Sequence, residues 1–126
     1  TMAESGRFAG ATRKLLPQLV HESRVDDAVG EEVMAMAQRV GRDAFLRQQR
    51  AIIDRPDSLP LLPAITVPTL LGVGEDDRMT LPEEARLMHE RIAGAHLHVF
   101  ARCGHLPPME VPQETAAVLR DWLTAV

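Results

Sequence analysis

Apolar residues in the first 58 positions recur at intervals of three and four, the spacing of helices with one buried face. The pattern predicts three helices. The first covers about residues 3–20 and contains Pro17, which we expect to bend or end it. The second stops at Gly41, and the third runs from residue 42 to just before Pro56. The apolar positions expected to face the core are Phe8, Ala11, Leu15, Leu16, Leu19, Val33, Met36, Ala37, Val40, Phe45, Leu46, Ile52 and Ile53.

Strand patterns begin after residue 58. Residues 69–73 form a continuous apolar run, which predicts a strand covered on both faces, as in a parallel sheet. Residues 96–100 begin with alternating polar and apolar positions, which predicts a second strand with one wetter face. The C-terminal part of the chain therefore reads as α/β.

Each predicted strand is followed by a helix. The first of these helices opens with Thr80 as its N-cap and Pro82 in its first turn, and Glu83 completes a capping box. Gly94 is placed to close its end. The last helix covers about residues 112–123. Its side chains expected to face inward are Val118, Leu119, Trp122 and Leu123.

The loops after the two strands hold the candidate chemistry. Two parallel strands joined by a right-handed helical crossover send both following loops to the same edge of the sheet, where ligands bind in open α/β sheets. Asp76 and Asp77 follow the first strand, and His105 follows the second. A carboxylate beside an imidazole fixes the tautomer of the ring and leaves Nε2 to move protons for a nucleophile. The sequence thus predicts an Asp–His pair with a catalytic role.

Two segments carry a family resemblance. Residues 67–77 read V-P-T-L-L-G-V-G-E-D-D, and residues 104–112 read G-H-L-P-P-M-E-V-P. Together they resemble the C-terminal part of α/β-hydrolase-fold enzymes, in particular esterase- and lactonase-like members with a helical cap. The resemblance implies that Asp77 is the acid of a catalytic triad and His105 its base. It makes Asp76 the poorer match for the acid and gives Glu110 a positioning role.

The same resemblance implies the fold and its division. Residues 59–126 would be the C-terminal part of the α/β-hydrolase core, namely its last two parallel strands with flanking helices. Residues 1–58 would be helices of the cap that precede them. The parent enzyme would cleave an ester, a lactone or a similar bond of a small carboxylic substrate, with a serine nucleophile and no cofactor.

The nucleophile itself does not match any residue here. In the family it lies on a Gly-x-Ser-x-Gly elbow upstream of the cap, and none of Ser5, Ser23 and Ser58 has that context. We therefore expect the chain to be about the C-terminal half of a hydrolase and to be inactive alone. Its expected partner is the missing N-terminal half or a second identical chain.

Two alternatives remain open from the sequence. One is a dehalogenase or epoxide hydrolase of the same family, in which the nucleophile is a carboxylate and His105 activates water. The other is a non-catalytic interaction module that kept the fold without its chemistry. The nucleophile on the missing elbow is the residue that separates the first alternative from an esterase.

The net charge and the composition argue against some classes of binding partner. Fourteen Lys and Arg against eighteen Asp and Glu give a net charge of −4, which argues against nucleic acid or an anionic membrane surface as a partner. The single cysteine, Cys103, excludes an internal disulfide framework. Prolines interrupt the longest apolar run, and the N-terminus lacks the features of a signal peptide. We expect a soluble, cytoplasmic protein.

A metal site is the remaining chemical alternative. His96, His98, Cys103 and His105 are residue types that bind zinc, but their spacing matches none of the usual zinc patterns. The two strand histidines are expected to face sideways, while Cys103 and His105 lie beyond the end of the strand. No metal is therefore expected.

Overall fold

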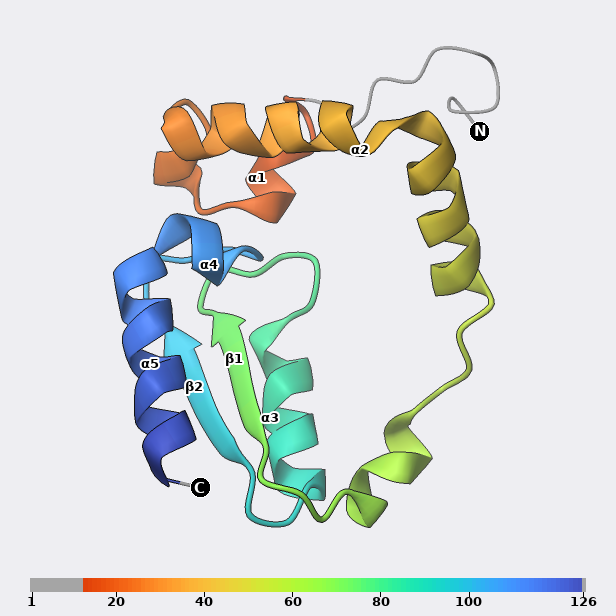
Figure 1. The fold of residues 1–126 in the computed structure, drawn as a ribbon, viewed down its shortest axis with the longest axis vertical. Helices are drawn as coiled ribbons and strands as arrows, with labels where there is room; N and C mark the ends of the chain where they lie inside the picture. The colour runs from red at the N-terminus through yellow and green to blue at the C-terminus, as the bar shows by residue number, and fades with distance from the viewer. Residues whose placement is uncertain (1–12, 126) are drawn as a thin grey trace.

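The computed structural model describes residues 13–125. Figure 1 shows a pair of strands with one helix on each side and further helices across one end of the strands. The elements are α1 (Leu16–Leu19), η1 (Glu22–Arg24), α2 (Ala28–Ile53), η2 (Leu59–Ala64), β1 (Leu70–Gly74), α3 (Pro82–Arg91), β2 (His96–Phe100), α4 (Pro107–Glu110) and α5 (Pro112–Ala125). No helix in this described part of the chain is long and apolar enough to cross a membrane.

The two strands pair in parallel. Their register runs from Leu70 opposite His96 to Gly74 opposite Phe100, and α3 connects them. This confirms the predicted strand–helix–strand unit. Because the strands run in the same direction, the loops that follow them leave from the same edge of the sheet.

The N-terminal helices pack at that edge. Leu16, Val20 and Val33 form a buried apolar cluster, and the half-buried Leu106 and Met109 pack against it from the segment after β2. Figure 1 shows α1 and the first half of α2 lying across the carboxyl ends of the strands. These helices, residues 16–53, are called the helical segment below, and they pack on the loop that carries His105.

The predicted division of the helical segment at Gly41 is confirmed. Gly41 has φ 77° and ψ 170°, which interrupts the helical backbone inside α2. A positive φ favours glycine because a Cβ atom makes this region costly for other residues. Beyond the break, the second half of α2 ends at Ile53, before Pro56 as predicted.

The structure corrects the predicted role of Pro17 and the predicted start of α3. The first described helix begins at Leu16, so Pro17 lies in its first turn instead of bending or ending it. The earlier part of that prediction, with Phe8 and Ala11, lies outside the described residues. The N-cap of α3 is Leu81 and not Thr80, and the Leu81 N–H donates to Glu84 rather than Glu83, at 2.9 Å. The reason for this shift is that Asp77 engages the Thr80 hydroxyl.

Six apolar side chains predicted to face the core are exposed instead. Their exposed fractions are 37% for Met36, 42% for Val40, 59% for Ile52, 77% for Ile53, 46% for Leu119 and 61% for Leu123. β1 is also less covered than predicted, since Leu70 and Leu71 are only half-buried. Apolar periodicity identifies which face of an element avoids water, but it does not supply the element that covers it. The described part of this chain has nothing packed closely on these positions.

Candidate active site

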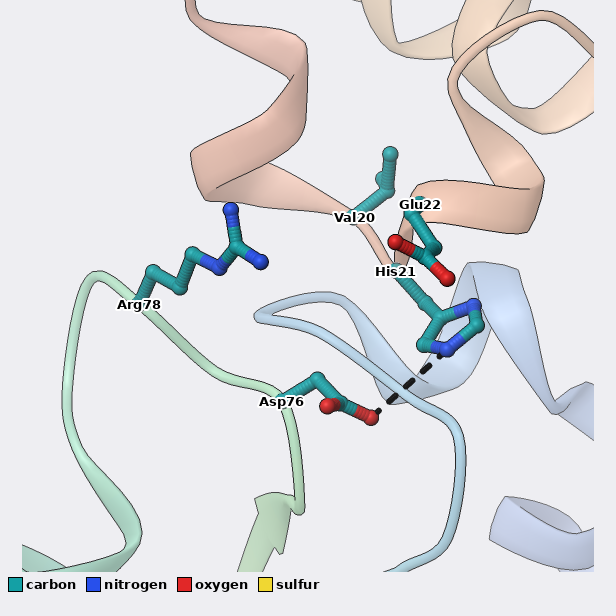
Figure 2. Close-up of a pocket in the computed structure, with 5 residues that line it drawn as sticks. All are labelled: Val20, His21, Glu22, Asp76 and Arg78. Atoms are coloured by element: carbon teal, nitrogen blue, oxygen red, sulfur yellow. Dashed lines mark ion pairs between the residues drawn. The ribbon is translucent and has the colours of Figure 1, made fainter.

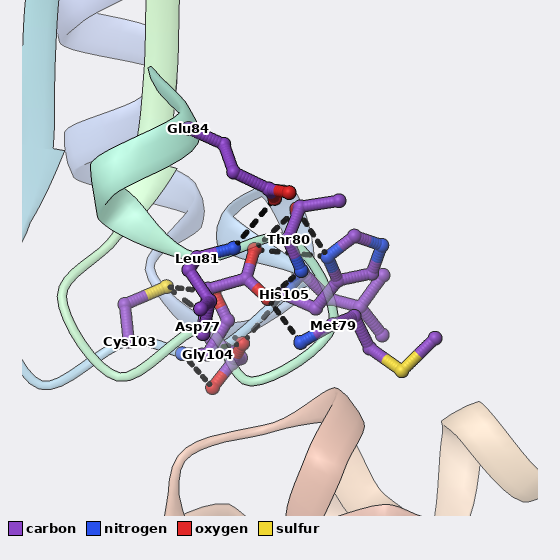
Figure 3. Close-up of polar contacts among 10 residues, drawn as sticks. Asp77, Met79, Thr80, Leu81, Glu84, Cys103, Gly104 and His105 are labelled. Carbon is purple, nitrogen blue, oxygen red and sulfur yellow. Dashed lines mark hydrogen bonds and ion pairs between the residues drawn. The ribbon is translucent and has the colours of Figure 1, made fainter. Parts of the chain in front are cut away.

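Asp77 and His105 meet at the carboxyl ends of the two strands. Asp77 lies in the loop after β1, His105 lies in the loop after β2, and Asp77 Oδ2 is 2.9 Å from His105 Nδ1. Figure 3 shows the two side chains facing one another. The Asp77 side chain is 4% exposed and the His105 side chain 34%. The parallel topology thus brings together the two residues that the sequence singled out.

The Asp77 carboxylate has hydrogen bonds on both oxygens. Oδ1 accepts the N–H groups of Met79 at 2.8 Å and Thr80 at 3.0 Å, and Oδ2 accepts the Thr80 hydroxyl at 2.9 Å. Burial favours the neutral form and acts to raise the pKa. The donors from Thr80, His105 and Met79 outweigh it and hold the pKa of Asp77 below its ordinary value of 3.8. Asp77 is therefore an anion at neutral pH.

An anionic Asp77 sets the tautomer of His105. A carboxylate can only accept hydrogen bonds, so the 2.9 Å contact requires a proton on Nδ1. In neutral His105 the lone pair then lies on Nε2, which has no hydrogen-bond partner among residues 13–125. The backbone N–H of His105 donates to the Leu19 carbonyl at 3.0 Å, which fixes the residue to the helical segment. The arrangement is that of an oriented general base.

Glu110 holds the loop around His105. Its side chain is buried, with 2% of the residue exposed. Its carboxylate accepts the N–H groups of Gly104 at 3.0 Å and Leu106 at 3.1 Å, the residues on either side of His105. It also accepts the His21 N–H at 2.6 Å, 89 positions earlier in the sequence. One buried carboxylate therefore ties the His105 loop to the helical segment.

Asp76 pairs with His21 and not with His105. Its carboxylate lies 3.7 Å from His21 Nε2, and its side chain is 45% exposed. The pair lies in a polar hollow of about 110 Å³ lined by Val20, His21, Glu22, Asp76 and Arg78. Figure 2 shows these five side chains and the contact between Asp76 and His21. The resemblance already made Asp76 the poorer match for the acid, and the geometry gives it no contact with the candidate base.

The other candidate groups lie outside this arrangement. Cys103 is fully buried, and burial together with the nearby Glu110 raises the pKa of its thiol to about 12. His98 Nε2 lies 2.9 Å from a Glu114 carboxylate oxygen on α5. Within residues 13–125, no group of three or more His, Cys, Asp or Glu side chains is arranged to hold a metal ion.

Two residues at the site were not identified from the sequence. Thr80 was interpreted as a helix cap, yet its hydroxyl binds Asp77 and lies 3.3 Å from His105 Nδ1. An Asp that accepts backbone N–H groups two and three residues later is a common turn, so the spacing from Asp77 to Thr80 could have revealed this contact. His21 carried no such signal, because its contacts to Asp76 and Glu110 are long-range.

Comparison with known proteins gives a family match. The model of the alpha/beta hydrolase family matches residues 3–118. A pimeloyl-[acyl-carrier protein] methyl ester esterase of Neisseria meningitidis is 31% identical over 109 residues, which is 86% of this chain and 35% of that protein. A proline iminopeptidase of Lactobacillus acidophilus is 41% identical over 64 residues, which is 51% of this chain and 22% of that protein.

A solved structure gives the same result. A thermophilic esterase from Thermogutta terrifontis superimposes with a TM-score of 0.84 at 33% identity, covering 89% of this chain and 42% of the esterase. This chain therefore spans less than half the length of that esterase and of the Neisseria relative.

Proposed function

This chain belongs to the alpha/beta hydrolase family, and from that premise we propose that it is the C-terminal part of a carboxylic ester hydrolase. In this proposal Asp77 is the acid and His105 the base of a catalytic triad. The nucleophile is a serine on a part of the protein outside this chain. One observation carries the proposal, namely the 2.9 Å contact between Asp77 Oδ2 and His105 Nδ1 at the carboxyl ends of adjacent parallel strands.

The chemistry follows from this geometry. His105 Nε2 takes the serine proton as the serine oxygen bonds to the ester carbonyl carbon, and Asp77 stabilises the imidazolium. When the tetrahedral intermediate collapses, the bond to the alcohol oxygen breaks and His105 gives that oxygen the proton. A water molecule then loses a proton to His105 and adds to the acyl carbon. His105 returns the proton to the departing serine, which completes hydrolysis without a cofactor.

The relatives support an ester as the bond that is cleaved. The names of the Neisseria protein and the Thermogutta protein both describe esterases. We assign to this chain the same reaction class, with an ester of a small carboxylic acid as substrate. We also assign residues 1–58 to the cap and residues 59–126 to the core, because α1 and α2 lie across the strand edge that carries the Asp–His pair.

The first test uses the 126-residue chain alone. Without a serine elbow there is no covalent route, so we expect no turnover of p-nitrophenyl acetate above that of the His105→Ala variant. Turnover by the chain that is lost in His105→Ala would contradict the assignment of the nucleophile to another part of the protein.

The second test restores the missing part. Residues 13–126 replace the equivalent C-terminal segment of the Thermogutta terrifontis esterase, and the hydrolysis rate of the chimera is measured. We expect activity that falls by at least about 10³-fold in His105→Ala and strongly in Asp77→Asn. His98→Ala and Asp76→Asn are the matched controls, because they remove the same side-chain types away from the proposed triad. A chimera whose activity survives His105→Ala would overturn the proposal.

A further inference from the structure

We propose that Thr80 is a positioning residue of the Asp77–His105 pair, through a hydroxyl that holds the Asp77 carboxylate in its orientation toward His105. This inference rests on the proposed function, because it gives Thr80 a role in the same triad. It concerns the side-chain hydroxyl alone. The backbone N–H of Thr80, which also binds Asp77, is present whatever the side chain.

The hydroxyl has one proton and two nearby polar atoms. Its oxygen lies 2.9 Å from Asp77 Oδ2 and 3.3 Å from His105 Nδ1. Asp77 is an anion that can only accept, so the short contact takes the hydroxyl proton. The oxygen of Thr80 then presents a lone pair toward His105 Nδ1.

The hydroxyl also restrains the carboxylate. Backbone N–H groups hold Oδ1, whereas Oδ2 has only the Thr80 hydroxyl and His105 as hydrogen-bond donors among the described residues. Removing the hydroxyl leaves His105 as the sole donor to Oδ2 there. Helix capping does not explain the residue, since Leu81 is the N-cap of α3. Thr80 thus acts on the chemistry through Asp77 and His105.

The test compares three substitutions. Thr80→Val removes the hydroxyl while keeping the branched shape, and Thr80→Ser keeps the hydroxyl. Thr124→Val is the matched control, because its hydroxyl donates to a backbone carbonyl on the exposed side of α5. The first measurement is the ¹H NMR signal of the His105 Nδ1 proton in the full 126-residue chain, which reports how well the Asp77 carboxylate is held against the ring. The second is kcat and KM of the esterase chimera.

The expected results separate positioning from general stability. We expect Thr80→Val to broaden and weaken the Nδ1 proton signal of His105, because Asp77 Oδ2 loses one of its two donors, and to lower kcat about tenfold with little change in KM. Thr80→Ser should keep both close to wild type, and Thr124→Val should change neither. An unchanged Nδ1 proton signal in Thr80→Val, or equal losses in Thr80→Val and Thr80→Ser, would overturn the inference. If the signal changes as expected while the activity of the chimera survives His105→Ala, the proposed function fails and the positioning role stands.

Discussion

Removing the Glu110 carboxylate is expected to destabilise the protein by several kcal/mol. Three backbone N–H groups, those of His21, Gly104 and Leu106, donate to it at 2.6–3.1 Å. A buried donor left without a partner costs about 1–3 kcal/mol. The Gly104 donor is buried, while the other two are partly buried and can recover part of the loss from water. For Glu110→Ala we therefore expect a loss of about 3–5 kcal/mol in the free energy of unfolding.

Glu110→Gln is the finer test. The amide has nearly the same shape as the carboxylate, but its NH₂ group cannot accept a hydrogen bond. The backbone N–H groups next to the NH₂ group would therefore lose their acceptor. We expect a loss of about 1–3 kcal/mol, between wild type and Glu110→Ala. The matched control is Glu83→Gln, which removes a charge from an exposed pair with Arg86 and should change stability by about 0.5 kcal/mol or less.

Urea unfolding measures these differences. Trp122 is the single tryptophan, so its fluorescence reports the transition. All variants are compared at one chain concentration, because self-association would make the midpoint depend on concentration. A Glu110→Ala variant within about 1 kcal/mol of wild type would refute the anchoring role of the carboxylate. So would equal losses in Glu110→Gln and Glu83→Gln.

Three further predictions follow from the site and the fold. The pKa of Asp77 is lower in the folded chain than its unfolded value of 3.8, so its contribution to stability is complete above that value and disappears as pH falls through the folded pKa. Asp77→Asn should lose less stability between pH 7 and pH 3 than wild type does, as measured by urea midpoints, and an equal loss would count against the hydrogen-bonded carboxylate. The pKa of the Cys103 thiol is raised to about 12, so it should stay unreacted with a disulfide reagent at pH 8 until urea unfolds the chain. Finally, β1 pairs only with β2 in the described residues, and exposed apolar side chains lie on α2 and α5. Sedimentation equilibrium of the 126-residue chain should therefore show self-association. A monomer that melts cooperatively over a wide concentration range would contradict this last prediction.

Much of the C-terminal fold could be predicted because local patterns determine it. The apolar run of β1, the alternating pattern of β2 and the helix start with Pro82 in its first turn are all determined by close neighbours in sequence. The same holds for the break at Gly41 in the N-terminal helices. Parallel pairing then followed from topology, and it placed Asp77 near His105 without any contact information.

The sequence-based predictions failed in three situations: where two local patterns competed for one side chain, where nothing covered an apolar face, and where a partner lay far away in the sequence. Thr80 was interpreted as the N-cap because Pro82 and Glu83 follow it at the right spacing. In the structure its hydroxyl binds Asp77, and Leu81 is the N-cap. Leu119 and Leu123 looked like core because periodicity marks an apolar face whether or not anything covers it. Glu110 was given a positioning role by resemblance, but its bond to His21 could not be read from two segments so far apart.

The Glu110 bridge also limits how the helical segment can move. His21 is bound to Glu110, Arg24 donates to the Glu110 carbonyl at 3.1 Å, and Leu19 accepts the N–H of His105. Residues 19–24 therefore cannot move away from the strands without breaking the hydrogen bonds that hold the loop around His105. Any opening motion that preserves the Asp–His pair must pivot farther along the chain, and the helix break at Gly41 is a natural hinge. The boundary between the part that stays fixed on the His105 loop and the part that can move would then lie inside α2, and not between the helical segment and the strands.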